Sequence, residues 1–242
     1  MTVNYGPNRY DVVGSFLRPA KLKQAREDFT AGTIDAAALK AIEDECITDL
    51  IAKEKKAGLR FITDGEFRRA TWHLDFMWAF EGIGHSATED GLPFHGEAAK
   101  IDDTYLTGKV SLAGEHPFVE HFRFVQSFED ENTTAKLTIP APAQFIEQFI
   151  MPMNRKATDA AYESDALLED DIVAAYLAFI EQVYAAGCRN LQFDDCSWGC
   201  LVDPKAELFF GTDQTGLARI KETLLRVNNR VLDAAPADLC IN

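Results

Sequence analysis

The stretch FITDGEFRRATWHLDF, residues 61–76, places charged side chains directly after a short apolar run. Asp64 and Glu66 stand where the apolar run ends, and Arg68 and Arg69 follow at once. In parallel α/β sheets, the carboxyl ends of the strands are where a site is usually assembled. Carboxylates at such a position also stabilise the start of a following helix, whose N-terminal end carries a partial positive charge. The stretch alone leaves both roles open for the two acids.

Predicted strands and helices alternate along the rest of the chain. Apolar runs that end in polar or special residues predict strands in YDVVGSF (10–16), LRFITDGE (59–66), TYLTGKVSL (104–112), TAKLTIPAP (134–142) and CRNLQFDDCSW (188–198), and the start of one in ADLCIN (237–242). Helical spacing predicts helices at 19–29, 35–58, 116–128, 169–187 and 215–235. Asp35 is the expected N-cap and Gly58 the expected C-cap of the second helix. This alternation favours parallel βαβ units.

Several predicted strands end in residues suited to a site, namely Ser15, Asp64, Glu66, Pro140, Pro142, Asp194 and Asp195. Because a (β/α)8 barrel gathers its site residues at the carboxyl ends of its strands, the pattern predicts an α/β fold of the TIM-barrel type. We expect a single domain over residues 1–242 with an insertion at about 82–103. The chain holds about five βα units and the start of a sixth strand, so we expect the barrel to be incomplete. An open parallel sheet is the alternative.

The composition narrows the class of partner. Hydrophobic residues make up 47% of the 242 residues, which is enough for a sizeable core. The net charge of −15 repels phosphate backbones, so we expect no nucleic-acid partner. The sequence has no apolar run of the roughly 20 residues that a membrane span needs, and it begins without a signal-peptide pattern. Five cysteines at irregular spacing fit free thiols, which predicts a protein of the reducing cytoplasm.

Three motifs in a fixed order carry a resemblance to a known family. VGSFLRP (13–19), TDGEFRRATWHLDF (63–76) and LQFDDCSW (191–198) resemble the cobalamin-independent methionine synthases, in particular their short single-domain branch and the C-terminal catalytic half of the full enzyme. HPF (116–118) and IPAP (139–142) agree with it. The resemblance implies a (β/α)8 barrel that moves a methyl group from 5-methyltetrahydrofolate, often polyglutamylated, to the thiol of homocysteine. It also implies a zinc ion, held by His, Cys, Glu and Cys, that keeps this thiol deprotonated.

The resemblance also implies substrate-binding residues. Gly14 and Ser15 match the turn that contacts the amino-acid backbone of homocysteine, whereas Glu66 and Asp194 match the carboxylates that bind its ammonium group. Trp198 is a candidate to stack on the pterin ring, with a role in the core or at its rim as the alternative. The catalytic proton donor stays unassigned.

Other residues of the same motifs have weaker assignments. Asp195 stands where the full enzyme often has Glu, and Trp72 is a second candidate for the pterin ring. Arg18 and Arg68 are candidates for the carboxylates of the folate tail, and Arg69 is expected instead to be a solvated surface residue.

The zinc ligands of the family do not map onto this sequence. Its first two ligands form a His-x-Cys pair at the tip of the sixth strand, and this sequence stops at DLCIN, so we expect the ligands beyond residue 242 and assign none to Cys240. We therefore expect this chain to be inactive alone as a 5-methyltetrahydropteroyltriglutamate–homocysteine S-methyltransferase. A different zinc site, from Cys196 and Cys200 with the nearby acids Asp194 and Asp195 and either His73 or His95, is an alternative, and a Cys196–His73 nucleophile is less favoured.

Two other classes of function remain open. One is a non-catalytic remnant that still binds an amino acid or a folate. The other is a different enzyme of the same barrel superfamily, such as a decarboxylase related to uroporphyrinogen processing or a corrinoid-dependent methyltransferase. Because an incomplete barrel exposes sheet edges and apolar surface, we also expect the chain to form homo-oligomers.

Overall fold

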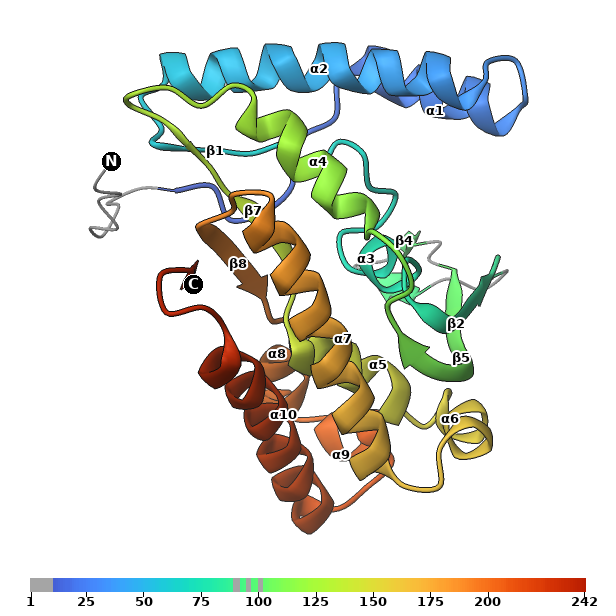
Figure 1. Cartoon of the computed structure of the whole chain (residues 1–242). Coiled ribbons are helices and arrows are strands. Elements are labelled where there is room, and N and C mark those ends of the chain that lie inside the picture. Colours follow the sequence, from blue (N-terminus) through green and yellow to red (C-terminus); the bar gives the residue numbers. More distant parts are fainter. Residues whose placement is uncertain (1–10, 89–91, 95–96, 100–101) are drawn as a thin grey trace.

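The computed structural model describes residues 11–88, 92–94, 97–99 and 102–242 (Figure 1). After an N-terminal segment without regular structure come α1 (Ala20–Thr30) and α2 (Ala36–Lys56), which pack side by side at one end of the molecule. Asp35 caps α2 by accepting a 2.8 Å hydrogen bond from the backbone N–H of Ala38, and Gly58 follows the helix with a left-handed φ of 83°. The predicted N-cap is confirmed, whereas the C-cap residue is Ala57 and Gly58 follows it in the left-handed conformation.

Two small parallel sheets position the candidate site. One pairs β1 (Phe61–Ile62) with β6 (Thr134–Ala135), and the other holds β7 (Leu137–Pro140), β8 (Asn190–Asp194) and β9 (Cys240–Ile241). β1 pairs with β6, and β8 lies between β7 and β9, all in parallel. Lys136 separates β6 from β7 and donates its backbone N–H to the carbonyl of Ile62 at 3.0 Å, so β6 and β7 run as one interrupted strand. The parallel pairing expected from the alternation of strands and helices is observed, with residues 61–62 beside 134–135 and residues 137–140 beside 190–194.

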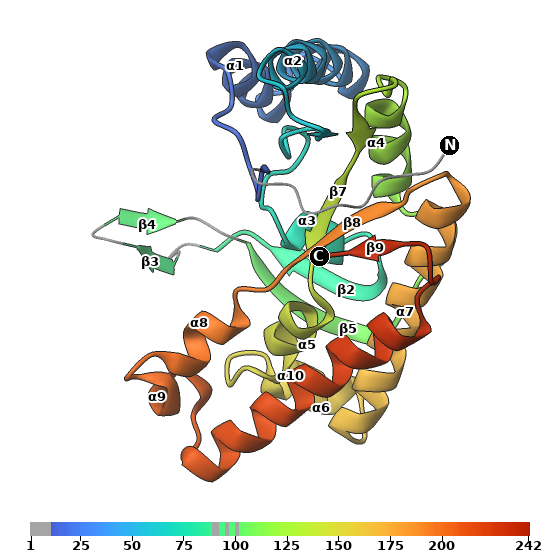
Figure 2. The ribbon, with the colours of Figure 1, turned by 90° about the vertical axis from the view of Figure 1, so that its left-hand side faces the viewer.

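The two faces of the sheet that holds β7 and β8 differ in character. Thr138 lies opposite Gln192 and Pro140 opposite Asp194, so the polar side chains of β7 and β8 point to one face. The alternate residues Leu137, Ile139 and Leu191 are buried in the apolar core, together with residues of α7 (Asp165–Ala185). α7 packs against α4 (Pro117–Gln126), α5 (Pro142–Ile150) and α10 (Gln214–Ala234), as Figure 2 shows from a second side.

The segment expected as a polar insertion is built from antiparallel strands. β2 (Glu81–Ser86) pairs with β5 (Asp103–Ser111), and β3 (Leu92–Phe94) pairs with β4 (Glu97–Ala99) and projects from the body of the molecule (Figure 2). Gly82 has a φ of 79° and lies against β5, where an added Cβ would come within 2.2 Å of the carbonyl oxygen of Lys109. This glycine allows the close approach of the two strands.

The expected strand at 10–16 is not observed in its described part, residues 11–16. The backbone N–H of Phe16 bonds to the carbonyl of Gly65 at 3.2 Å, but side chains bind the neighbouring carbonyls of Val12 and Val13. The segment therefore crosses the strand ends without joining the sheet.

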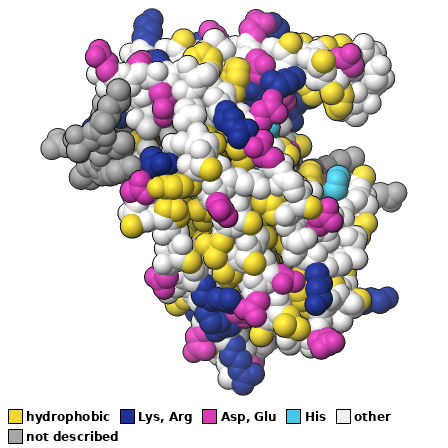
Figure 3. Space-filling model, viewed as in Figure 1, with side chains coloured by type: hydrophobic (Ala, Val, Ile, Leu, Met, Phe, Trp, Pro, Cys, Tyr) yellow, Lys and Arg dark blue, Asp and Glu magenta, His cyan; other side chains and the backbone are white. Residues whose placement is uncertain are grey.

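Short helices complete the α/β architecture: α3 (Leu74–Met77), α6 (Arg155–Ala161), α8 (Ser197–Val202) and α9 (Ala206–Phe210). In the described part of the chain the strands form small sheets, and no barrel closes. None of the helices described there has the length and apolarity needed to cross a membrane. On the face in Figure 3, acidic and basic side chains are interspersed.

Candidate functional site at the strand ends

A tight turn follows β1 and carries Glu66. Gly65 and Glu66 both have left-handed backbone, with φ values of 60° and 59°, and for a residue with a side chain this conformation costs of order 1 kcal/mol. Two side chains stabilise the turn: Asp64 Oδ1 accepts the N–H of Glu66 at 2.8 Å, and Thr63 Oγ1 accepts the N–H of Gly65 at 3.1 Å. Asp64 therefore shapes the turn that presents Glu66, and no helix begins there for it to cap.

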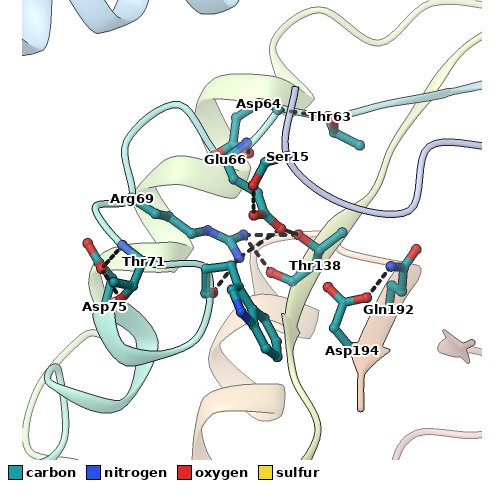
Figure 4. A network of polar contacts seen from close by, with 12 residues as sticks. Ser15, Thr63, Asp64, Glu66, Arg69, Thr71, Asp75, Thr138, Gln192 and Asp194 are labelled. Carbon is teal, nitrogen blue, oxygen red and sulfur yellow. Dashed lines mark hydrogen bonds and ion pairs between the residues drawn. The ribbon is translucent and has the colours of Figure 1, made fainter. Parts of the chain in front are cut away.

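The carboxylate of Glu66 connects three separate parts of the chain (Figure 4). Ser15 Oγ donates to Oε2 at 2.5 Å, and Thr138 Oγ1 from β7 donates to Oε1 at 2.9 Å. Arg69 Nη1 lies 3.3 Å from the same Oε1. Glu66 is only 2% exposed, so it is an ionisable group held in place by its neighbours.

Arg69 is buried, so the expectation of a solvated surface arginine is wrong. It is 1% exposed, donates to the carbonyl of Thr138 at 2.6 Å and to that of Trp72 at 3.1 Å, and lies 4.6 Å from the ring centroid of Phe118. A cation at this depth requires charged and polar partners, and Glu66 and the two carbonyls supply them. Arg69 is therefore part of the support for Glu66.

Arg18 and Arg68 also have protein partners. Arg18 donates to the carbonyls of Glu66 at 3.0 Å and of Arg69 at 2.7 Å, which fixes the N-terminal segment to the turn. Arg68 pairs with Glu43 at 3.3 Å and Asp44 at 2.5 Å on α2. Contact of either arginine with a folate tail stays a prediction.

Asp194 ends β8 on the polar face of the sheet and is partly exposed. Gln192 Nε2 donates to its Oδ1 at 2.5 Å. Burial, and after it the nearby negative charge of Glu66, raises the pKa of the Asp194 carboxyl to about 6 against the opposing effects of the Gln192 hydrogen bond, Arg69 and Lys136. Ser15, Glu66 and Asp194 therefore gather at one end of the sheet. Of the two carboxylates, Asp194 is more accessible than Glu66.

Trp198 and Gly14 lie outside the hydrogen-bonded network around Glu66. Trp198 Nε1 donates to Asp195 Oδ2 at 2.9 Å, and Asn228 of α10 donates to the same oxygen at 3.1 Å, so Asp195 connects α8 to α10. A Cβ added at Gly14 would meet no atom within 4 Å. Contacts of Gly14 with an amino acid and of Trp198 or Trp72 with a pterin stay predictions.

The described residues do not fit a zinc ion: they contain no group of three or more His, Cys, Asp or Glu side chains arranged to hold a metal. Burial, followed by the negative charge of Glu147, raises the pKa of the Cys200 thiol to about 11. Burial lowers the pKa of His73 to about 4, and its ring packs 4.5 Å from that of Trp72. The alternative set of Cys196, Cys200 and His73 is therefore not assembled, and His95 lies outside the described residues.

Three residues of this region were not predicted from the sequence: Thr138, Lys136 and Gln192. The side chain of Lys136 is 0% exposed and lies on the polar face of the sheet beside Gln192. A lysine inside an otherwise apolar strand was the available signal, because lysine is almost never fully buried unless it is paired.

These features define a class: an α/β protein with a parallel sheet whose strand ends gather two carboxylates and a serine hydroxyl. No family model matches the chain. The uncharacterized Bacillus subtilis protein YxjH is 36% identical over 199 residues, which are 82% of this chain and 51% of YxjH. The uncharacterized YxjG of the same organism is 32% identical over 236 residues, 97% of this chain and 60% of YxjG.

Two solved structures are similar to the chain. A Listeria monocytogenes protein assigned as a vitamin-B12 independent methionine synthase superimposes with a TM-score of 0.75 at 32% identity, over 97% of this chain and 64% of that one. A B12-independent methionine synthase from Shewanella, solved in complex with selenomethionine, has a TM-score of 0.58 at 16% identity, over 86% and 53%. The chain belongs to the cobalamin-independent methionine synthase family, and it spans 51% to 60% of the length of the curated relatives.

Proposed function

We propose that Ser15, Glu66 and Asp194 bind the amino-acid end of homocysteine, for methyl transfer from 5-methyltetrahydrofolate to its thiol. The observation that carries the proposal is the convergence of these three side chains, from segments far apart in the sequence, at the carboxyl ends of parallel strands. The family membership supports the same role. An incomplete (β/α)8 barrel over residues 1–242, with an insertion at about 82–103, is the arrangement we propose for the fold.

The proposed roles follow from charge. Asp194 takes the ammonium group because it is the more accessible carboxylate and, with a pKa of about 6, is mostly ionised at neutral pH. Glu66 adds a second negative charge beside it. The backbone N–H groups at Gly14 and Ser15 face the substrate carboxylate, which needs donors, because the single hydroxyl proton of Ser15 is donated to Glu66. The Shewanella relative was solved with selenomethionine, which carries the same ammonium and carboxylate groups.

Zinc enters only as an expectation from the family. When bound, the zinc ion keeps the thiol of homocysteine deprotonated, so that the thiolate can accept the methyl group. The described residues do not fit it, so we propose that its ligands come from elsewhere in the active site.

Calorimetric titration with L-homocysteine tests the proposal. We expect saturable binding by the wild-type chain and a loss of about tenfold or more in Asp194→Asn, since a hydrogen bond to a charged group contributes about 1.5–3 kcal/mol. 4-Mercaptobutanoate, which has no ammonium group, should bind weakly and equally to both proteins. Asp233→Asn, an exposed change on α10, is the matched control and should bind as wild type does. Equal affinity of wild type and Asp194→Asn for L-homocysteine would refute the proposed site.

A further inference from the structure

Lys136 is a fully buried cation with three acceptors. Its side chain is 0% exposed, and Nζ lies 2.9 Å from Asp11 Oδ2 and 2.8 Å from Gln192 Oε1 and also donates to the carbonyl of Val12. An ammonium group has three donors and no acceptor, so this set uses its full capacity. Lys136 therefore joins the N-terminal segment to β8 beneath the candidate site.

The same lysine fixes the orientation of the Gln192 amide. Because Lys136 only donates, the amide oxygen of Gln192 has to face it, and the amide nitrogen then faces the opposite way. Gln192 Nε2 donates to the carbonyl of Val13 at 2.5 Å and to Asp194 Oδ1 at 2.5 Å. Gln192 and Asp194 are two residues apart on one strand, so both point to the same face of the sheet.

We propose that Lys136 and Gln192 are positioning residues for the amino-acid site. They orient the Asp194 carboxylate by holding Oδ1, and they hold the backbone of residues 12–13 so that Ser15 reaches Glu66. This inference rests on the proposed function for its substrate. Neither residue needs to touch the substrate to act in this way.

The charges around Asp194 give the inference a measurable consequence. Asp194 is faced by Glu66 and Arg69 from the turn after β1, by Lys136 from the interrupted strand, and by Cys196 from its own segment. The hydrogen bond from Gln192 and the charge of Lys136 both favour the ionised form of Asp194. Removing either one should raise the pKa of Asp194, so that less of it is ionised at neutral pH.

Two variants and a matched control test the inference. Lys136→Met removes the charge and keeps the length of the side chain, and Gln192→Met leaves Lys136 paired with Asp11. Lys55→Met is the control, because Lys55 also binds a backbone carbonyl and a carboxylate, those of Phe128 and Asp130, away from the network around Glu66. The readout is the titration of Asp194 by NMR of 13C-labelled aspartate carboxyls, with circular dichroism to confirm folding.

We expect Asp194 to titrate near pH 6 in wild type and Lys55→Met, and about half a unit to one unit higher in Lys136→Met and Gln192→Met. L-Homocysteine affinity should fall about two- to fivefold at pH 6 in both variants, less than about twofold at pH 7, and recover fully at pH 8.5, which a purely structural defect would not do. Folded variants in which Asp194 titrates as in wild type would overturn the inference. A shifted titration without homocysteine binding by the wild-type chain would refute the proposed function and support the positioning of Asp194.

Discussion

The hydroxyl of Ser15 lies 2.5 Å from Oε2 of Glu66, although the two residues are 51 positions apart in the sequence. The other carboxylate oxygen of Glu66 accepts from Thr138, which is 72 positions further along the chain. One carboxylate thus joins the N-terminal segment, the turn after β1 and the strand β7. The site forms only when these three segments fold together.

Glu66→Gln should destabilise the chain strongly. Arg69 is 1% exposed, and its carboxylate partner is Glu66, so the variant leaves a buried cation without that anion. Breaking a buried pair in this way costs about 3–5 kcal/mol in free energy of unfolding, measured by urea denaturation. Asp49→Asn, which breaks the exposed pair with Lys53, is the control and should change the value by no more than about 1 kcal/mol. An equally small effect of Glu66→Gln would show that Arg69 does not depend on Glu66.

Substitution by alanine should affect stability at Gly65 and homocysteine binding at Gly14. Gly65 has a φ of 60°, and an added Cβ would lie 2.4 Å from Leu50 Cδ2, so Gly65→Ala should lower the free energy of unfolding by about 1–3 kcal/mol. Gly14 has open space around its Cα, and Gly14→Ala should change stability by less than about 0.5 kcal/mol. If Gly14 faces the substrate, Gly14→Ala weakens homocysteine binding in calorimetry while the unfolding curve stays in place. A large stability loss at Gly14 would show that the N-terminal segment is packed differently.

The helices could be predicted from local signals, since the cap at Asp35 and the left-handed Gly58 act within a few residues of the helix they end. The error at residues 11–16 has a long-range cause. The carbonyls of Val12 and Val13 are bound by side chains from Lys136 and Gln192, which lie 124 and 179 positions away. Alternating apolar residues predict a strand only when the backbone groups are free to join a sheet.

The candidate site shows the same contrast between features with a local sequence signal and features that depend on distant residues. Glu66 and Asp194 could be found because carboxylates at strand ends are visible in the sequence, and the family motifs include them. The burial of Arg69 could not be predicted, because its main acceptor is the backbone carbonyl of Thr138, 69 positions away. Every residue has a backbone carbonyl, so the sequence does not indicate which one is the acceptor. Exposure of a cation depends on such distant partners more than on its neighbours in the chain.

Glu54 should make part of the stability depend on pH. Burial raises the pKa of its carboxyl to about 7, although its hydrogen bonds from Thr63 oppose the shift. The folded state therefore holds this proton where the unfolded state has released it, so the contribution of Glu54 is present at low pH and is lost as pH rises through about 7. Glu54→Gln should gain stability relative to wild type between pH 5 and about pH 8, measured by urea denaturation at each pH.

Glu131→Gln is the control for this comparison because Glu131 is exposed. Its curve of unfolding free energy against pH should run parallel to that of wild type. A constant difference between Glu54→Gln and wild type over the same range would show that Glu54 is ionised in the folded protein throughout.

The zinc content of the purified chain is a separate prediction. Because the described residues assemble no group of three ligands, we expect the 242-residue chain, loaded with zinc and then dialysed, to keep well below one zinc per chain in elemental analysis. One retained zinc per chain, lost in the double variant Cys196→Ser and Cys200→Ser, would contradict this expectation and assign the metal to α8.

Anomalous diffraction from crystals of the chain soaked with L-selenomethionine tests most directly whether Ser15, Glu66 and Asp194 form an amino-acid site. The account predicts a selenium peak at the carboxyl ends of β7 and β8, with the ammonium nitrogen of the amino acid about 3 Å from the carboxylate of Asp194 and its own carboxylate toward Ser15. A selenium peak at the opposite end of the sheet, or an empty site at saturating selenomethionine, would contradict it.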